Sequence, residues 1–284
     1  LIYLYKSTRV SNQILIIYLF KMQQERNYSI DLLKTILAFL IVLHHSPSPF
    51  HDTMQPITTC AVPTFFMISG FLIFRKEISF KRIMKNAIRI MKIFLGALLI
   101  FYIWFWIRHE ELYIPNFKDI CLMVFANNEP LSGHLWYLMA YAYALIVIAI
   151  FTLKGKMQYL KYIAIIGLVL YFLFDIWHIY CNVPKYLTLV YCFRNFFFTA
   201  IPMMFIGSTV VDRNSIRTKT IAVWLIFFSI CAWVEMNSFH VNHIADVYFF
   251  TIPLSFFLFS LFVNCKIRKP NILTKCGEKY SLYI

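Results

Sequence analysis

The chain has 284 residues, of which 61% are hydrophobic, 19% aromatic and only 14% charged. Soluble domains are about 45–50% apolar and about 25% charged, so this composition excludes a water-soluble globule. A net charge of +14 is common among nucleic-acid-binding proteins, but here the basic residues form short clusters between apolar runs, which argues against nucleic acid. Runs such as 135–153 and 247–263 are long enough to cross a bilayer as helices.

Residues 1–25 are predicted to be an N-terminal extension outside the fold. The chain begins with Leu1, and the apolar run 14–20 is too short to span a bilayer. Met22 opens a stretch that is more typical of a cytoplasmic start, so we interpret the extension as the product of a mis-assigned start. This leaves 26–284 as one membrane domain.

The apolar runs of this domain predict an all-α, polytopic transmembrane bundle of about nine helices. They lie near 30–45, 57–74, 90–107, 135–153, 160–177, 191–211, 220–236 and 246–264, and a ninth begins after Gly277. Too few residues follow Gly277 to span, so the last helix is expected to be truncated and the domain incomplete at its C-terminus.

Basic residues distinguish the two sides of the predicted bundle. When loops are assigned alternately to the two sides, one side collects lysine and arginine at every crossing, which predicts that it is cytoplasmic. These residues are Lys21, Arg26, Arg75, Lys76, Lys81, Arg82, Lys85, Arg89, Lys92, Lys154, Lys156, Arg213, Arg217, Lys219, Lys266, Arg268 and Lys269. All 8 histidines fall on the other side. His240 and His243 have a metal-compatible spacing, but the lack of a third ligand argues against zinc.

The segment 80–92 is predicted to be an amphipathic helix at the cytoplasmic interface. One face is apolar and another carries the basic residues Lys81, Arg82, Lys85, Arg89 and Lys92. Two interpretations stay open. The basic face either anchors the helix to anionic lipid headgroups or binds a phosphorylated cytoplasmic cofactor.

The first predicted helix carries charged residues, which are costly in a membrane and therefore usually mark function. Asp31 and Lys34 are three residues apart, share a helical face and can neutralise each other. His45 lies on nearly the same face, about 16 Å further along, which is too far for the pair to orient its imidazole. With small Ala38 between them, this face is predicted to line a path across the bilayer. His44 points about 100° away and is less favoured.

Four ordered segments resemble motifs of the acyltransferase-3 family, membrane enzymes that O-acetylate lipopolysaccharide, peptidoglycan and other glycans. The segment 26–45 resembles the first membrane helix, 62–72 the second-helix motif, 133–138 the motif that opens the fourth helix, and 194–207 a later one. The segment 277–284 resembles the start of the last helix. The family usually has arginine where this chain has Lys34, which keeps the charge and loses the planar fork.

This resemblance implies that 26–284 is a membrane acyltransferase domain of the bacterial inner membrane. It transfers an acyl group, usually from acetyl-CoA, to a hydroxyl of a carbohydrate or lipid-linked glycan, with no metal and no tightly bound cofactor. The implied catalytic residues are His45, Lys34 and Asp31, with His45 either the general base or an acyl carrier. The implied donor-binding residues are Lys81, Arg82, Lys85, Arg89, Lys92 and Ser69, and the acceptor-binding residues are His134, Trp136 and Arg194.

A transporter or flippase for a glycan or small solute is the alternative, because intramembrane Asp, Lys and His also serve transport pathways. The sequence has no inverted repeat and no Walker-type phosphate loop, which disfavours it. A purely structural membrane protein is a third interpretation, and it leaves the ordered motifs unexplained.

Overall fold

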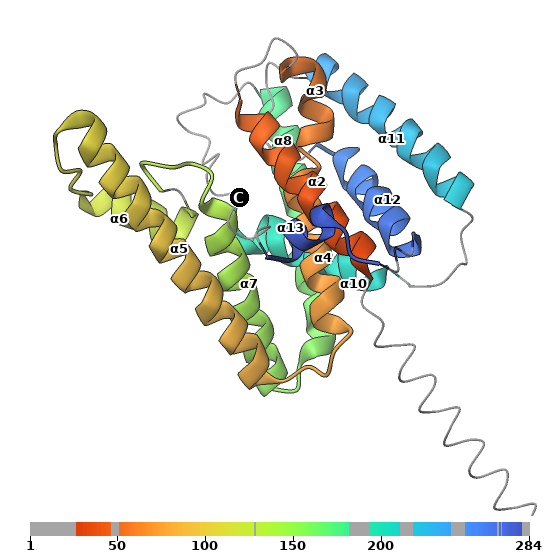
Figure 1. Cartoon of the computed structure of the whole chain (residues 1–284), viewed down its shortest axis with the longest axis horizontal. Coiled ribbons are helices and arrows are strands. Elements are labelled where there is room, and N and C mark those ends of the chain that lie inside the picture. Colours follow the sequence, from red (N-terminus) through yellow and green to blue (C-terminus); the bar gives the residue numbers. More distant parts are fainter. Residues whose placement is uncertain are drawn as a thin grey trace, which may run out of the picture.

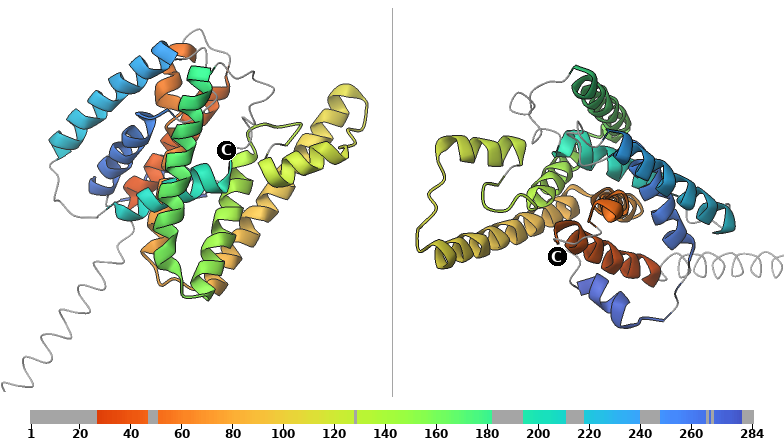
Figure 2. Two further views of the ribbon diagram at one scale, coloured as in Figure 1. Left: turned by 180° about the vertical axis from the view of Figure 1, so that it is seen from behind. Right: turned by 90° about the horizontal axis from the view of Figure 1, so that it is seen from above.

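The computed structural model describes residues 27–46, 51–127, 129–181, 194–210, 218–239, 248–265, 267 and 269–279. The predicted extension 1–25 lies outside these residues, as do His240 and His243. Within the described ranges every regular element is helical, which confirms the all-α prediction (Figures 1 and 2).

Where the structure describes them, the predicted apolar runs fall mainly in helices, and the described residues include six helices long and apolar enough to cross a membrane. The α-helices are α2 (Tyr28–His45), α3 (His51–Thr58), α4 (Ala61–Phe74), α5 (Phe80–His109), α6 (Phe117–Ala126), α7 (Trp136–Leu153), α8 (Leu160–Cys181), α10 (Ile201–Thr209), α11 (Thr218–Phe239), α12 (Thr251–Asn264) and α13 (Ile272–Lys279). The 3-10 helix η1 (Met157–Tyr159) precedes α8, and the π-helix η2 (Phe196–Ala200) runs into α10.

The helix α5 differs from the sequence prediction. The expected interfacial segment 80–92 and the expected spanning helix 90–107 form one continuous helix of 30 residues, about 45 Å long. A single buried stripe explains the continuity, because Ile83, Ala87, Ile90 and Phe94 follow one another along the face that packs against α7. The helix exceeds the roughly 30 Å hydrocarbon core, so its basic first turns extend beyond that core.

The helix α13 also differs, because it begins at Ile272 and already contains Gly277. Its start is capped: the Thr274 backbone N–H donates to Asn271 Oδ1 at 2.8 Å, and the Asn271 backbone N–H donates to Thr274 Oγ1 at 2.9 Å. Polar caps of this kind fix a helix N-terminus and carry no hydropathy signal. An apolar-run prediction therefore places the start too late.

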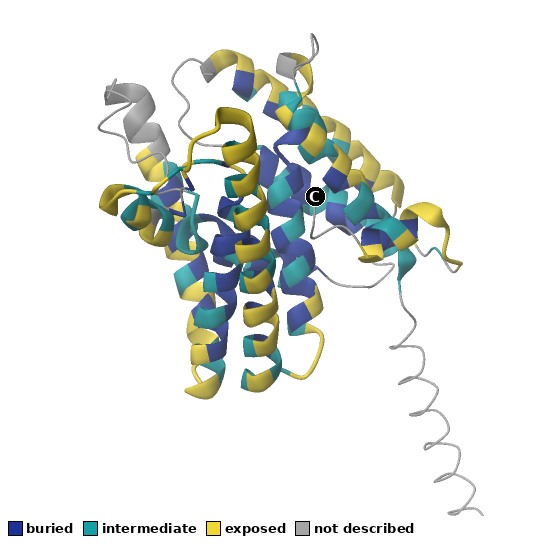
Figure 3. Ribbon diagram, turned by 60° about the vertical axis from the view of Figure 1, so that its left-hand side comes forward, coloured by how far each residue is buried: buried dark blue, intermediate teal, exposed yellow. Residues whose placement is uncertain are grey.

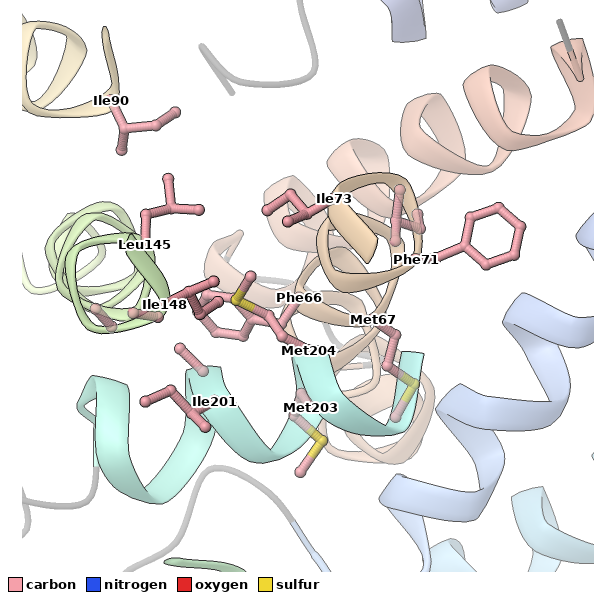
Figure 4. Packing of buried hydrophobic residues seen from close by; sticks show 14 of the residues in the cluster. Phe66, Met67, Phe71, Ile73, Ile90, Leu145, Ile148, Ile201, Met203 and Met204 are labelled. Atoms are coloured by element: carbon pink, nitrogen blue, oxygen red, sulfur yellow. The ribbon is translucent and has the colours of Figure 1, made fainter. Parts of the chain in front are cut away.

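The helix α4 lies at the centre of the bundle and packs against α10, α12 and α2. Glycines allow α4 and α10 to approach closely, as is usual between membrane helices. A Cβ atom added at Gly70 would overlap the Met204 carbonyl, and one added at Gly207 would overlap the Met67 carbonyl. Figure 4 shows the buried side chains of α4, α7 and α10 that meet around this crossing.

The outward faces of the helices are apolar. Ile100 and Ile107 of α5 are 67% and 61% exposed, and Ile226 of α11 is 62% exposed. Figure 3 shows the exposed residues along the outer helices and the buried residues between them. An apolar surface of this extent on long helices suits a hydrocarbon surrounding, where backbone groups are already paired within each helix.

Candidate active site

The first turn of α2 is fastened to the chain that follows α12. Asn27 caps the helix by accepting from the Ser29 backbone N–H at 3.0 Å, and its own amide donates to the Val263 carbonyl at 3.1 Å. The Ser29 hydroxyl donates to the Cys265 carbonyl and accepts from the Ile267 backbone N–H. These bonds hold the start of α2 in one position inside the bundle.

The charged pair expected on α2 is present. Lys34 Nζ lies 3.1 Å from Asp31 Oδ1, and their side chains are 20% and 6% exposed. The helix α13 packs on the same turn: the Thr35 hydroxyl donates to the Leu273 carbonyl at 2.6 Å, and a Cβ atom at Gly277 would overlap the Asp31 carbonyl. Ala38, one turn further, is 2% exposed, so this face of α2 is directed into the bundle.

We expect Lys34→Met to destabilise the protein, because it removes the cation beside the buried Asp31 carboxylate. Loss of a partner for a buried charged group costs about 1–3 kcal/mol or somewhat more, reduced here by the partial exposure of Lys34. Lys34→Arg keeps the charge and should retain most of the stability. Thermal unfolding in detergent measures both effects, and a double variant with Asp31→Asn should be less destabilised than the sum of the two single variants. Strict additivity would contradict the coupling.

Two histidines meet at the other end of α2. The rings of His45 and His134 have centroids 4.9 Å apart, and the Phe101 ring of α5 lies edge-on to His134 at 5.7 Å. Both histidines are exposed. His45 is the predicted catalytic residue and His134 a predicted acceptor-binding residue, and the structure brings the two side chains together from positions 89 residues apart.

A third histidine, His44, contacts His45. Its Nδ1 lies 3.0 Å from the Thr58 hydroxyl, which donates its single proton to the Gln55 carbonyl at 3.1 Å. The His44 ring meets His45 edge-on, with centroids 5.1 Å apart.

The remaining predicted acceptor and donor residues occupy more enclosed positions. Trp136 is 9% exposed and packs against Phe66 of α4. The Ser69 hydroxyl donates to the Phe65 carbonyl of its own helix at 2.9 Å. Arg194 is partly buried, and its carbonyl accepts from Asn127 at 3.1 Å.

The basic residues of α5 divide into two kinds. The Arg82 guanidinium donates to the Ile73 carbonyl at 2.9 Å and the Lys76 carbonyl at 3.4 Å, so it caps the end of α4. Four others are exposed and share one face within about 80°; we call them the cationic stripe. They are Lys81, Lys85, Arg89 and Lys92.

The cationic stripe and the histidine pair lie at opposite ends of the bundle. The helices α5 and α7 are packed neighbours that run in opposite directions, so the start of α5 lies beside the end of α7 (Figure 1). The stripe belongs to the start of α5, and His134 immediately precedes α7.

The loop between α5 and α6, at the histidine end, holds a tyrosine–carboxylate pair. The Tyr113 hydroxyl donates to Asp119 Oδ2 at 2.9 Å. Partial burial, together with this hydrogen bond and the Asp119 charge, raises the pKa of Tyr113 to about 12. The hydrogen bond joins Tyr113, in the loop, to the first turn of α6.

Sequence reasoning missed Glu129, which is 2% exposed although it lies in a loop rich in acidic residues. Its carboxylate accepts from the backbone N–H groups of Leu131 and Ser132 and from the Ser132 hydroxyl. The only sequence signal is a Glu followed three residues later by Ser, ahead of the motif at 133–138. This signal is too short to distinguish a buried carboxylate from an exposed one.

The long apolar helices define a polytopic membrane protein, and among the described residues no group of three or more His, Cys, Asp and Glu is arranged to hold a metal. The acyltransferase domain family matches residues 27–284. The chain therefore belongs to the acyltransferase-3 family and is a membrane acyltransferase. Searches of curated proteins and of solved structures gave no significant match.

Proposed function

We propose that this membrane acyltransferase transfers an acyl group, most simply acetyl, from acyl-CoA to a hydroxyl of a cell-envelope carbohydrate. The observation that carries the proposal is the contact between His45 and His134, at the end of the bundle away from the cationic stripe. An alcohol is a weak nucleophile and needs a base that works near neutral pH. An exposed histidine is suited to this role.

In the proposed reaction His45 removes the proton of the acceptor hydroxyl as the oxygen attacks the thioester carbonyl. A carbon–oxygen bond forms, the carbon–sulfur bond breaks, and the imidazolium returns the proton to the leaving CoA sulfur. His134 lies beside the base and would hold the acceptor by a hydrogen bond. A base of this kind contributes about 10²–10⁴-fold to the rate.

The cationic stripe would bind the phosphates of CoA from the cytoplasmic side. Four exposed cations on one face provide the charge that a pyrophosphate and a 3′-phosphate require. The positive-inside rule supports this orientation, with the histidine end facing the periplasm of a bacterial inner membrane. The Asp31–Lys34 pair and Ser69 would then line the route of the pantetheine arm.

We expect a triple change of Lys81, Lys85 and Arg89 to glutamine to raise KM for acetyl-CoA with little change in kcat. Each lost phosphate contact weakens binding by about 1 kcal/mol, so the combined effect is about 100-fold. Steady-state kinetics with purified enzyme measures it. Arg82→Gln is the matched comparison, because Arg82 caps α4, and it should lower the melting temperature instead. An unchanged KM in the triple variant would refute donor binding at the stripe.

The acyltransferase proposal is tested by mass spectrometry of envelope glycans from cells with and without the gene. We expect a mass increment on a sugar that mild base removes, because esters hydrolyse under conditions that leave amides intact. A base-stable increment would establish N-acylation and overturn the O-acyl assignment. Movement of a glycan across the membrane with no increment would favour a transporter or flippase.

A further inference from the structure

The turn that carries His134 is held at its start by a buried side chain and at its end by a backbone hydrogen bond. Asn127, which is 1% exposed, adopts a left-handed conformation with φ 54°, and its side-chain amide donates to the Arg194 carbonyl. The Ser132 carbonyl accepts from the Leu135 backbone N–H at 3.2 Å, which leads directly into α7. His134 projects from this turn toward His45.

Glu129 binds the middle of the turn. Its two carboxylate oxygens accept from the Leu131 backbone N–H at 3.1 Å, from the Ser132 hydroxyl at 2.7 Å and from the Ser132 backbone N–H. Hydrogen bonds to an ionised acceptor are roughly twice as strong as neutral ones. Three of them on one buried carboxylate give this turn a single geometry.

A buried carboxylate is an expensive way to close a surface turn, because a charged group loses its hydration when it is buried. Turns are ordinarily closed by small polar side chains such as Asn, Asp and Ser at much lower cost. This desolvation cost is expected where a turn must hold a side chain in position to within a fraction of an ångström, as active sites require. The side chain presented here is His134, whose ring is in contact with His45 and Phe101.

We propose that Glu129 is a positioning residue: through the turn 129–134 it holds the His134 imidazole against His45 and so sets where the acceptor hydroxyl binds. The inference rests on the proposed function, since it gives His134 a role in acceptor binding. Glu129 does not touch the substrate, and it acts only through His134.

The kinetic test is a double-mutant cycle between Glu129→Gln and His134→Ala in the purified full chain. The amide keeps one acceptor oxygen and turns an N–H₂ donor toward the turn, so we expect about tenfold lower kcat/KM for the acceptor, the effect of losing one such hydrogen bond. KM for acetyl-CoA should not change. In the His134→Ala background, Glu129→Gln should have no further effect. Additive losses would overturn the proposal.

A second measurement keeps the inference testable without acyl transfer. Diethylpyrocarbonate modification of each histidine is followed by mass spectrometry, with His109 as the internal reference. Glu129→Gln should raise the modification rate of His134 relative to His109, because the ring leaves its contacts with Phe101 and His45. The matched control is Glu111→Gln, which changes an exposed glutamate in the loop between α5 and α6 and should leave the ratio as in the wild type.

The two measurements separate the two hypotheses. An inactive wild-type enzyme with a Glu129-dependent His134 modification rate would contradict the proposed function and keep the positioning role. An active enzyme whose His134 modification rate is the same in Glu129→Gln would refute the positioning role alone. Where Glu129→Gln does not reach the membrane, Ser132→Ala removes a single bond of the same set and should give a smaller change in the same direction.

Discussion

Replacing His45 with alanine is expected to lower acyl transfer by about 10²–10⁴-fold or more while the protein still reaches the membrane at normal levels. The loss follows from removal of the base that activates the acceptor hydroxyl. Folding should be little affected, because the side chain is exposed at the end of α2 and does not belong to the core. Ester-linked acyl groups on envelope glycans, measured by mass spectrometry, report the activity.

The matched control for this variant is His109→Ala, which removes another exposed histidine, at the end of α5. It should retain wild-type activity. Wild-type activity in His45→Ala would refute the assignment of the base. If His45 carries the acyl group covalently, rapid quenching with labelled acetyl-CoA in the absence of acceptor should leave label on the protein, and a general base leaves none.

The sequence was sufficient to predict the spanning helices, because a long apolar run indicates a membrane helix. It was not sufficient to predict helices that are short or polar, or whose length depends on packing against another helix. The helix α6 has only 10 residues and does not resemble a membrane span. The first residues of α3 (HDTMQPIT) are polar and give no apolar signal, although its later residues fall within the candidate span Thr53–Phe74. The continuity of α5 depends on its packing against α7, which local hydropathy does not report.

In the candidate site, contacts within one helix could be predicted from the sequence, and contacts between distant segments could not. The Asp31–Lys34 contact was predictable because it lies within one helix turn, where spacing alone brings two side chains together. The contact between His45 and His134 joins distant segments, and only the family motifs pointed to both residues. The contacts of Arg82 and Glu129 could not be predicted for a common reason: their hydrogen bonds go to backbone groups of neighbouring turns, which a sequence does not display.

A substitution at the α4–α10 crossing should have the largest effect on stability. In Gly207→Val the new Cβ atom would overlap the Met67 carbonyl, which belongs to the backbone and has no alternative rotamer. Overpacking typically costs about 1–3 kcal/mol and more where the backbone must move. The crossing lies in the main core, so α10 must separate from α4 and the bundle should fail to assemble. Fluorescence-detection size exclusion of a tagged protein would show aggregation or loss.

Gly96→Ala on α5 is the control, since nothing lies within 4 Å of a Cβ atom there. Alanine should leave folding intact or stabilise the helix by about 1 kcal/mol, because glycine is a poor helix former. Gly70→Val offers the reciprocal test from α4, where the new atom meets the Met204 carbonyl. Normal assembly of both valine variants would mean that the two helices do not cross this closely. If both valine variants fail to assemble while Gly96→Ala assembles normally, the close crossing of α4 and α10 is established. This crossing holds α4 in the bundle, and α2 with its histidine end packs against α4.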